Sequence, residues 1–254
     1  MEAIILAAGL GSRLAEVSGG RPKCLAEVGG RALIEHQLDS LVRVGVTKVF
    51  VVVGHRAELV QSHLDRWPQV HFVPNERFAE TNSLYSLWLA RGCVQDDFLV
   101  LNGDVLAHPD IYRRVGALGG TGLAFDSNSG FDSEHMKVCF RDARLTGIAK
   151  DLPEHRISGE NLGILRIDAD TAGPLFHEAG CLLGEHGLQA WAPAVFHRMA
   201  AQLPIRGVDV SDLPWTEIDF PEDLHHARDQ IWPEVGLNQP IQRRHFHEDP
   251  VRRL

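Results

Sequence analysis

Apolar runs alternate with amphipathic stretches along the first hundred residues. The runs that predict buried strands are residues 3–8, 48–53, 70–73 and 98–101. The stretches with helical spacing of apolar positions are residues 32–44, 57–66 and 81–91, the last with Thr81 as candidate N-cap. Such alternation predicts an α/β fold whose sheet is mixed and mostly parallel, flanked by helices. Ligands of such sheets bind beyond the carboxyl ends of the strands.

The pattern changes after residue 118. Residues 119–165 contain shorter strand-like pieces separated by turn-rich segments, which predicts a small antiparallel β insertion. The remaining predicted elements are helices at 171–180 and 192–202, strands at 205–208 and 215–218, and a helix at 221–231. We therefore predict a single domain over residues 1–235, followed by a basic tail at 236–254.

Charge and composition exclude several classes of protein. Twenty-five Lys and Arg against 34 Asp and Glu give a formal net charge of -9, which argues against nonspecific nucleic-acid binding. The four cysteines are scattered without a C-x-x-C pair, so neither a zinc site nor a disulfide framework is expected. No stretch approaches the roughly 20 apolar residues of a membrane span. We expect a cytoplasmic protein that does not bind membranes.

The histidine-containing segments near the end of the chain do not favour a metal site. His225 and His226 are adjacent and cannot share one helix face, and His245 and His247 lie in the tail. The tail is either a solvated terminus or an arm that mediates assembly, and a homo-oligomer stays open.

A glycine loop after the first predicted strand carries the strongest chemical signal. Its residues are Leu6, Ala7, Ala8, Gly9, Leu10, Gly11, Ser12, Arg13 and Leu14, with Pro22 and Lys23 downstream. Small residues let backbone N–H groups approach phosphate oxygens, and Arg13 and Lys23 supply positive charge. Leu14 stands where a dinucleotide fingerprint needs a third glycine, and the G-K-[ST] of a P-loop is absent. The loop predicts a triphosphate site of another kind.

Two aspartates follow predicted strands. Asp104 comes after Asn102-Gly103, and Asp219 follows the run 215–218. A divalent ion that bridges phosphate oxygens needs hard oxygen ligands, so this pair predicts a Mg2+ site. The alternative is that each aspartate caps a helix or forms a turn, as Asp219 before Phe220-Pro221 would do.

Together these motifs resemble a known family. The glycine loop with Pro22-Lys23, the segments 75–78 and 81–87, Asn102-Gly103-Asp104 and Glu217-Ile218-Asp219 are similar to those of cytidylyltransferases for phosphocholine, inositol 1-phosphate and phosphonates. These enzymes are part of the superfamily of MobA-like and sugar nucleotidyltransferases. The resemblance covers about residues 1–230 and is closest to the phosphocholine and phosphonate branch.

The resemblance implies a Rossmann-like domain and a role for each motif. The loop from Leu6 to Arg13 and Lys23 would hold the triphosphate of CTP, with Asn82 and Ser83 near the base, and Asp104 and Asp219 would hold Mg2+. The acceptor oxygen would attack the α-phosphorus in line, with no covalent enzyme intermediate. The implied catalytic residues are Arg13, Lys23, Asp104 and Asp219.

The acceptor side is the less regular part of the resemblance. Lys137 and Lys150 are candidates to contact the acceptor or the α-phosphate, although an exposed strand lysine is the plainer interpretation. Trp191 remains in the region where phosphocholine enzymes carry acids and aromatics, but Leu188 and Ala192 stand in place of the acids. The acids left to bind an amine are Glu160 and Glu217.

We therefore predict transfer of CMP from CTP to a small phosphonate or phosphorylated alcohol or amine. The alternatives are a sugar 1-phosphate or inositol 1-phosphate nucleotidyltransferase and a nucleotide-sensing subunit without turnover. The retention of Arg13, Lys23, Asp104 and Asp219 argues against the second alternative.

Overall fold

The computed structural model describes residues 1–14, 19–130 and 132–236, so the tail expected from residue 236 lies almost entirely outside it. The strands are β1 (Glu2–Ala7), β2 (Glu27–Val28), β3 (Arg31–Ala32), β4 (Lys48–Val53), β5 (Val70–Pro74), β6 (Phe98–Asn102), β7 (Val105–Ala107), β8 (Gly122–Asp126), β9 (Lys137–Arg141), β10 (Arg144–Ala149), β11 (Gly159–Ile167), β12 (Arg206–Asp209) and β13 (Trp215–Glu217). The α-helices are α2 (Leu33–Arg43), α3 (Ala57–His63), α4 (Ser83–Leu89), α5 (Pro109–Gly116), α6 (Ala169–His186), α7 (Pro193–Met199), α8 (Pro221–His226) and α9 (Trp232–Gly236). No helix in these ranges has the length and apolar character needed to cross a membrane.

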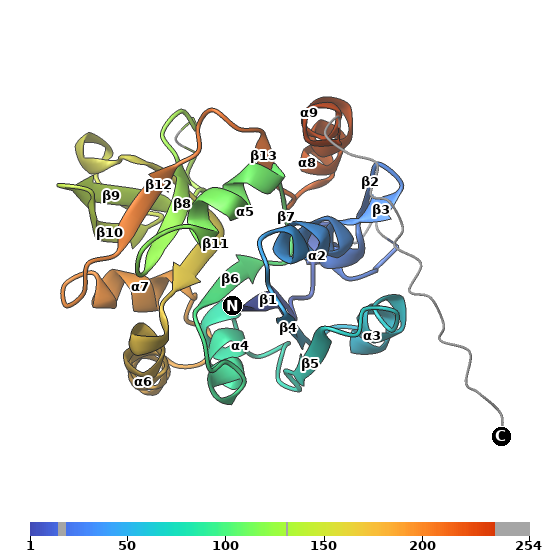
Figure 1. The fold of residues 1–254 in the computed structure, drawn as a ribbon, viewed down its shortest axis with the longest axis horizontal. Helices are drawn as coiled ribbons and strands as arrows, with labels where there is room; N and C mark the ends of the chain where they lie inside the picture. Colours follow the sequence, from blue (N-terminus) through green and yellow to red (C-terminus); the bar gives the residue numbers. More distant parts are fainter. Residues whose placement is uncertain (15–18, 131, 237–254) are drawn as a thin grey trace, which may run out of the picture.

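One mixed sheet runs through the molecule (Figure 1). Within the described residues its nine strands are ordered β5-β4-β1-β6-β11-β8-β12-β10-β9. The strands from β5 to β6 are parallel, whereas β11 is antiparallel to both β6 and β8. The expected mixed α/β fold is confirmed; the first four strands of this order are all parallel, whereas in the rest of the sheet only β8 and β12 form a parallel pair among the described residues. The antiparallel strands of the 119–165 region extend this same sheet.

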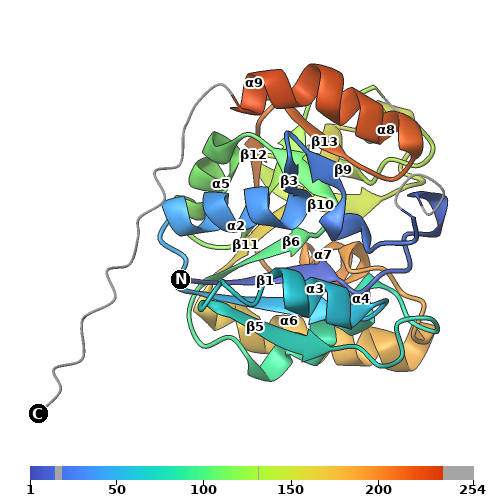
Figure 2. The ribbon, with the colours of Figure 1, turned by 90° about the vertical axis from the view of Figure 1, so that its right-hand side faces the viewer.

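Alternating side chains divide the core between the two faces of the sheet. In β1, Ala3 and Ile5 point to one face and Ile4 to the other, because successive strand residues alternate. The first face packs against α2, α3 and α5, and the second against α4, α6 and α7. Figure 2 shows these helix layers on either side of the sheet. These β1 side chains are completely buried on both faces, which explains why the first strand is an uninterrupted apolar run in the sequence.

A third apolar cluster fixes the end of the described chain beside the glycine loop. Leu14, Val28 and Leu33 pack against Ile218 and Leu224. Helices α8 and α9, joined by a π-helical turn, therefore lie over the β2–β3 hairpin (Figure 2). This packing brings the segment after β13 next to Leu14, at the end of the glycine loop, and to the β2–β3 hairpin.

Most predicted elements are present, but several short ones were missed. These are the hairpin β2–β3, strands β7 and β10, and helix α5. Their two- to eight-residue lengths carry little periodicity, and Gly147 interrupts the pattern of β10. The prediction of Thr81 as an N-cap was wrong, since Asn82 caps α4 and its Oδ1 accepts from the Ser83 N–H at 2.7 Å. Thr81 Oγ1 instead accepts a hydrogen bond from Asn75.

We expect two glycine substitutions to have opposite effects on stability. Gly163 lies at φ +70°, at a bulge of β11, and an added Cβ would come 2.4 Å from Asn102 Nδ2. Gly163→Ala should destabilise by more than about 1 kcal/mol. Exposed Gly184 in α6 has open space around its Cα, so Gly184→Ala should stabilise by about 0.5–1 kcal/mol. Chemical denaturation checks both, and equal effects would contradict the strain at Gly163.

Candidate active site

The predicted motifs meet in one cavity beyond the carboxyl ends of β1 and β6. Its volume is about 340 Å³. The expected nucleotide and metal residues that line it are Leu6, Ala7, Ala8, Gly9, Gly11, Ser12, Arg13, Lys23, Asn82, Ser83, Asp104 and Asp219. Of the expected acceptor residues, Lys150, Trp191 and Glu217 also line it. Segments separated by more than 200 residues in the sequence, such as those of Leu6 and Asp219, therefore share one site.

The backbone of the glycine loop is held close to two other parts of the site. Gly11 has φ +60°, and a Cβ there would lie 2.8 Å from Lys23 Cγ. Gly103 N–H donates to Leu6 O at 3.0 Å, and a Cβ on Gly103 would lie 2.9 Å from that oxygen. Glycine is needed at both positions because the loop, Lys23 and the turn after β6 approach so closely.

Strand pairing places the two aspartates together. The short strands β7 and β13 are antiparallel, with Glu217 opposite Val105. Beyond this pair, the Ile218 N–H donates to the Asp104 carbonyl at 3.0 Å, so Asp219 emerges next to Asp104. The N-cap of α8 is Phe220, and Asp223 accepts from the N–H groups of Asp219 and Phe220. The Asp219 side chain is therefore not used as a helix cap.

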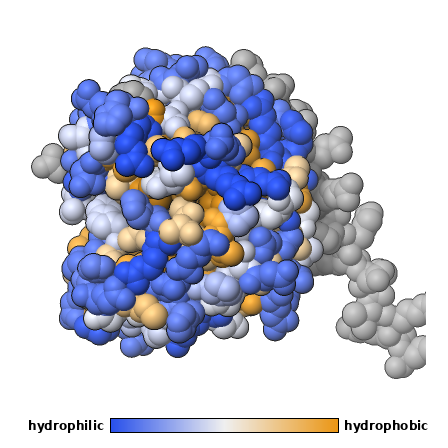
Figure 3. All heavy atoms as spheres, turned by 90° about the vertical axis from the view of Figure 1, so that its left-hand side faces the viewer, coloured by the Kyte–Doolittle hydropathy of each residue, from blue (hydrophilic) through white to orange (hydrophobic). Residues whose placement is uncertain are grey.

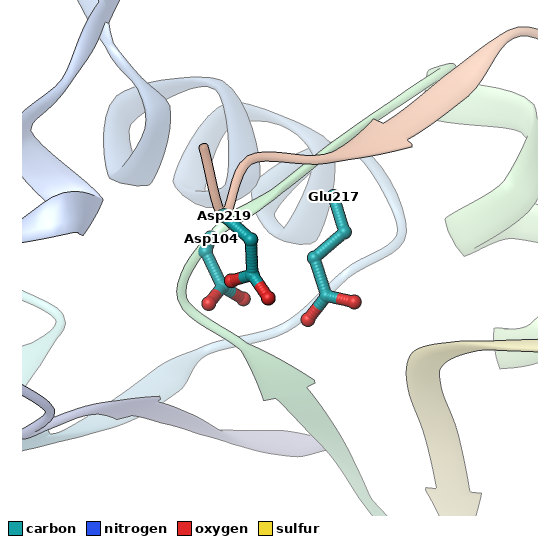
Figure 4. A group of neighbouring side chains, drawn as sticks. All are labelled: Asp104, Glu217 and Asp219. Carbon is teal, nitrogen blue, oxygen red and sulfur yellow. The ribbon is translucent and has the colours of Figure 1, made fainter. Parts of the chain in front are cut away.

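A three-carboxylate cluster forms at the base of the cavity. Asp104, Glu217 and Asp219 each offer an oxygen within 4.8 Å of the others, and Figure 4 shows the three side chains converging. Lys23 Nζ donates to Asp104 Oδ2 at 2.8 Å and also to Asp219 Oδ1. Burial alone would lower the pKa of Lys23, but the charges of Asp104 and Asp219 raise it well above its usual range. Burial, followed by the charges of Asp104 and Asp219, raises the pKa of Glu217 well above its usual range.

The chemistry of this cluster fits a hard divalent cation such as Mg2+. Carboxylate oxygens are the ligands that Mg2+ prefers. Asp104 Oδ1 is buried and has no hydrogen-bond partner among the described residues, so its lone pairs are free to bind a ligand. Glu217 was expected only as an acceptor contact, yet its carboxylate belongs to the same group as the two aspartates.

A second set of charges crosses the mouth of the cavity. Glu134 Oε2 lies 3.5 Å from Arg13 Nη1 and 3.1 Å from Lys150 Nζ. Arg13 Nη1 also lies 3.7 Å from Asp219 Oδ2. Lys150, followed by Arg13, lowers the pKa of Glu134. These cations face the cavity and are partly exposed, so an anionic ligand can reach them.

The start of α4 is hydrogen-bonded to the loop that carries Trp191. The Asn82 N–H donates to Leu188 O at 2.9 Å, and Ser83 Oγ accepts from the Ala192 N–H at 2.8 Å. Trp191 is 51% exposed, and Lys150 Nζ lies 5.0 Å from its ring centroid. The segments expected near the base and near the acceptor thus form one wall of the cavity.

Two expected acceptor residues lie outside the lining of this cavity. Lys137 is buried, and its Nζ donates to Lys150 O at 2.7 Å. Glu160 is also buried, and its Oε2 accepts a hydrogen bond from Ser129 Oγ and lies 3.2 Å from His135 Nδ1. Burial raises the pKa of Glu160. Lys137 supports the backbone of Lys150 in this structure.

Several lining residues were not assigned to the site from the sequence, although some of them lie in the motifs named above. They are Cys24, Asn75, Phe78, Thr81, Ser86, Asn102, Gly103, Glu134, Met136, Asn161 and Pro193. Asn75 and Asn102 belong to motifs that carried the resemblance, so a signal for them existed. Glu134 lies in a polar turn and Asn161 inside a buried strand, and neither position has a sequence pattern that marks a site. Asn161 Oδ1 is buried without a hydrogen-bond partner among the described residues.

The chain belongs to the family of MobA-like NTP transferase domains, whose sequence model matches residues 3–157. This match confirms the superfamily indicated by the sequence motifs. The chain is 33% identical over 248 residues to a CMP-5'-(3-aminopropyl)phosphonate synthase of Streptomyces rubellomurinus, covering 89% of this chain and 38% of that protein. It is 27% identical over 121 residues to a CTP:phosphoglutamine cytidylyltransferase of Campylobacter jejuni, covering 45% of this chain and 48% of that protein. The chain thus spans half or less of the length of these two relatives.

Solved structures share the fold over nearly the whole chain. The inositol-1-phosphate CTP transferase of T. maritima superposes with a TM-score of 0.79 at 22% identity, covering 94% of this chain and 97% of that one. The CTP:phosphocholine cytidylyltransferase of Streptococcus pneumoniae gives 0.75 at 21% identity, covering 89% and 97%. At these identities the likeness is one of fold.

We expect Glu217→Gln to stabilise the metal-free protein at neutral pH. Because the pKa of Glu217 is raised on folding, its ionisation destabilises the folded state, and stability falls as pH rises above the unfolded pKa of about 4.3. Glutamine removes this charge from the cluster. Thermal unfolding in EDTA should show a higher Tm for the variant at pH 7.5, by about 2–4 °C for each kcal/mol gained.

The same comparison near pH 4 provides the control. At this pH a larger fraction of Glu217 is protonated in both the folded and the unfolded chain than at pH 7.5. The difference in Tm between wild type and Glu217→Gln should therefore be smaller. A variant that is less stable than wild type at pH 7.5 would contradict the repulsion that we assign to the cluster.

Proposed function

We propose that this protein transfers CMP from CTP to a small phosphonate or phosphorylated alcohol or amine and releases pyrophosphate. The observation that carries the proposal is the convergence of a cation-bearing glycine loop and three carboxylates on one cavity. A triphosphate needs both, since cations and N–H groups bind its oxygens and a divalent ion neutralises its charge. The names of the relatives and of the solved structures above support CTP as the donor.

The residues of the cavity divide into three groups by role. Arg13 and Lys23, with the backbone of the loop, bind the triphosphate, and Asn82 and Ser83 contact the base side. Asp104 and Asp219, with Glu217 beside them, would hold Mg2+. When bound, the ion supplies charge stabilisation at the attacked phosphate.

The reaction is an in-line displacement at the α-phosphorus. A phosphoryl or phosphonyl oxygen of the acceptor forms a bond to this phosphorus. The bond from phosphorus to the oxygen that bridges to the β-phosphate breaks, and pyrophosphate leaves with the electron pair. The acceptor oxygen is already anionic at pH 7, so a general base is not required. This chain's residues contribute by positioning the two anions and by offsetting their mutual repulsion.

The acceptor side of the cavity continues into a second one of about 530 Å³. The two share Met136, Lys150, Trp191 and Pro193. Apolar side chains predominate in the second cavity, including Ile148, Leu182, Ala190 and Ala194. In the view of Figure 3, apolar surface is exposed in a hollow between hydrophilic rims. The Nζ atom of Lys150 lies over the ring of Trp191. A positive charge at the far end of the acceptor would compete with Lys150 for this ring, so we do not require the acceptor to be a cation.

A second candidate function is an inositol 1-phosphate or sugar 1-phosphate nucleotidyltransferase. The likeness of the fold to the T. maritima inositol-1-phosphate CTP transferase favours this alternative. The apolar continuation beside Trp191 favours the small non-sugar acceptor, since a polyol would leave hydroxyl groups without partners there. A sensing subunit without turnover is disfavoured because every charge of the site is retained. Cytoplasmic location and oligomeric state stay predictions.

A grid of substrates tests the proposal directly. Pyrophosphate release is measured with Mg2+ and CTP, UTP, ATP or GTP against phosphocholine, 2-aminoethylphosphonate, 2-hydroxyethylphosphonate, inositol 1-phosphate and glucose 1-phosphate. We expect release with CTP and one small phosphonate or phosphoester. Asp104→Asn should reduce it at least about 100-fold, since metal-ion stabilisation is worth several kcal/mol. Preference for a sugar phosphate, or triphosphate binding without turnover across the grid, would contradict the proposal.

Filling the second cavity tests the orientation of the acceptor. Ala194→Phe should raise the KM for acceptors with longer chains, because the aromatic ring occupies space next to Trp191. The KM for CTP and the activity with methylphosphonate, which is too short to reach that space, should stay within about twofold of wild type, as expected for a distant site. Equal loss with short and long acceptors would show that the acceptor lies elsewhere.

A further inference from the structure

Gln37 holds the turn that carries Asp104. This glutamine lies in α2 and is 1% exposed. Its Nε2 donates to Asn102 O at 2.8 Å and to Val105 O at 2.9 Å. These carbonyls flank Gly103 and Asp104, so one amide group binds the backbone on both sides of the aspartate.

The polar side chain of Gln37 lies in an apolar layer, where its burial costs free energy. Gln37 is surrounded on its helix by Ile34, Leu38 and Leu41, which belong to the core. Its Oε1 is buried and has no hydrogen-bond partner among the described residues. An unpaired buried acceptor costs about 1–3 kcal/mol, a penalty that the two hydrogen bonds donated by Nε2 must offset. Packing alone does not explain a glutamine here.

The geometry of the turn explains what the amide provides. The Gly103 N–H is bonded to Leu6 O, and the Asp104 carbonyl accepts from the Ile218 N–H. Both bonds attach the turn to neighbouring backbone. Gln37 adds an attachment from the helix layer, through two donors on one planar group. Asparagine would be one methylene shorter, and a hydroxyl group has a single donor.

We propose that Gln37 is a positioning residue for the metal site, acting through the backbone of the turn to fix the Asp104 carboxylate. The inference rests on the proposed function, because it assigns Asp104 to a divalent cation. Partners that orient a metal ligand commonly change metal affinity or activity about 10- to 100-fold when they are removed. Gln37 itself does not touch the substrate cavity.

The test compares Mn2+ binding by variants of the full chain. Gln37→Met keeps the length of the side chain but removes both donors. Bound Mn2+ is measured by electron paramagnetic resonance with CTP kept below the protein concentration, and a titration of CTP without protein gives the Mn2+ that the nucleotide binds by itself. We expect the Mn2+ dissociation constant to rise about 10- to 100-fold. The rate of pyrophosphate release should also fall at low Mg2+ and recover in part when Mg2+ is raised.

Ser40→Ala is the matched control. Ser40 lies on the same helix, is 4% exposed, and donates from Oγ to His36 O without touching the turn. It should lower thermal stability without changing Mn2+ affinity. If Gln37→Met lowers stability while its Mn2+ affinity matches that of Ser40→Ala, the positioning role is overturned.

Two further variants separate the possible failures. Should Gln37→Met not fold, Gln37→Glu keeps the length and polarity but offers at most one donor, and unchanged Mn2+ affinity in it would also overturn the inference. Asp104→Asn removes a ligand and should lose Mn2+ binding. If wild type neither binds Mn2+ with CTP nor releases pyrophosphate, the proposed function fails; if wild type does both and the Gln37 variants match it, only the positioning role fails.

Discussion

The organisation of this site depends on the electrostatic cost of bringing three carboxylates within 4.8 Å of one another. Like charges at this distance repel strongly in a partly buried environment. The ammonium of Lys23 offsets part of this repulsion by bonding to Asp104 and Asp219, and Glu217 responds with a raised pKa. A cluster of this kind is stabilised by additional positive charge, so in the proposed function these carboxylates would bind a divalent ion. The glycine loop carries Arg13 and backbone N–H groups that would bind an anionic ligand.

The fold makes this cluster from distant segments through backbone contacts. Parallel strands β1 and β6 end at one edge, so the glycine loop and the Asp104 turn lie side by side. The β7–β13 pair brings Asp219 to the same edge, and the third apolar cluster holds the following helices in place. Gln37 extends these contacts into the helix layer. The proposed metal site is thereby connected to the hydrophobic core, whereas the proposed acceptor side is built on longer connections around Glu134 and Trp191.

The family match spans both sides of the cavity. It covers the glycine loop and the Asp104 turn, and also Glu134 and Lys150. The relatives named above act on different acceptors, and the acceptor wall is where this chain carries an apolar continuation beside Trp191. Substitutions on that wall change the shape of a pocket without disturbing the charge balance at the carboxylates. In the proposed function, the reaction class and the acceptor preference would therefore depend on separate parts of one cavity.

The sequence by itself determined the chemistry of the central site. Gly9, Gly11, Arg13, Lys23 and Asp104 lie in short local motifs, and the strands before them are marked by apolar runs, so local patterns were enough. The tertiary structure decided what depends on register and on long-range packing. In the structure Glu217 belongs to the carboxylate cluster, whereas Lys137 and Glu160 lie outside the cavity lining. Glu134 and Gln37 contact residues that are far away in the chain. A local sequence pattern indicates the face of a strand or helix on which a side chain lies. The distant residue that this side chain contacts depends on strand register and helix packing, which cannot be inferred from a single stretch of sequence.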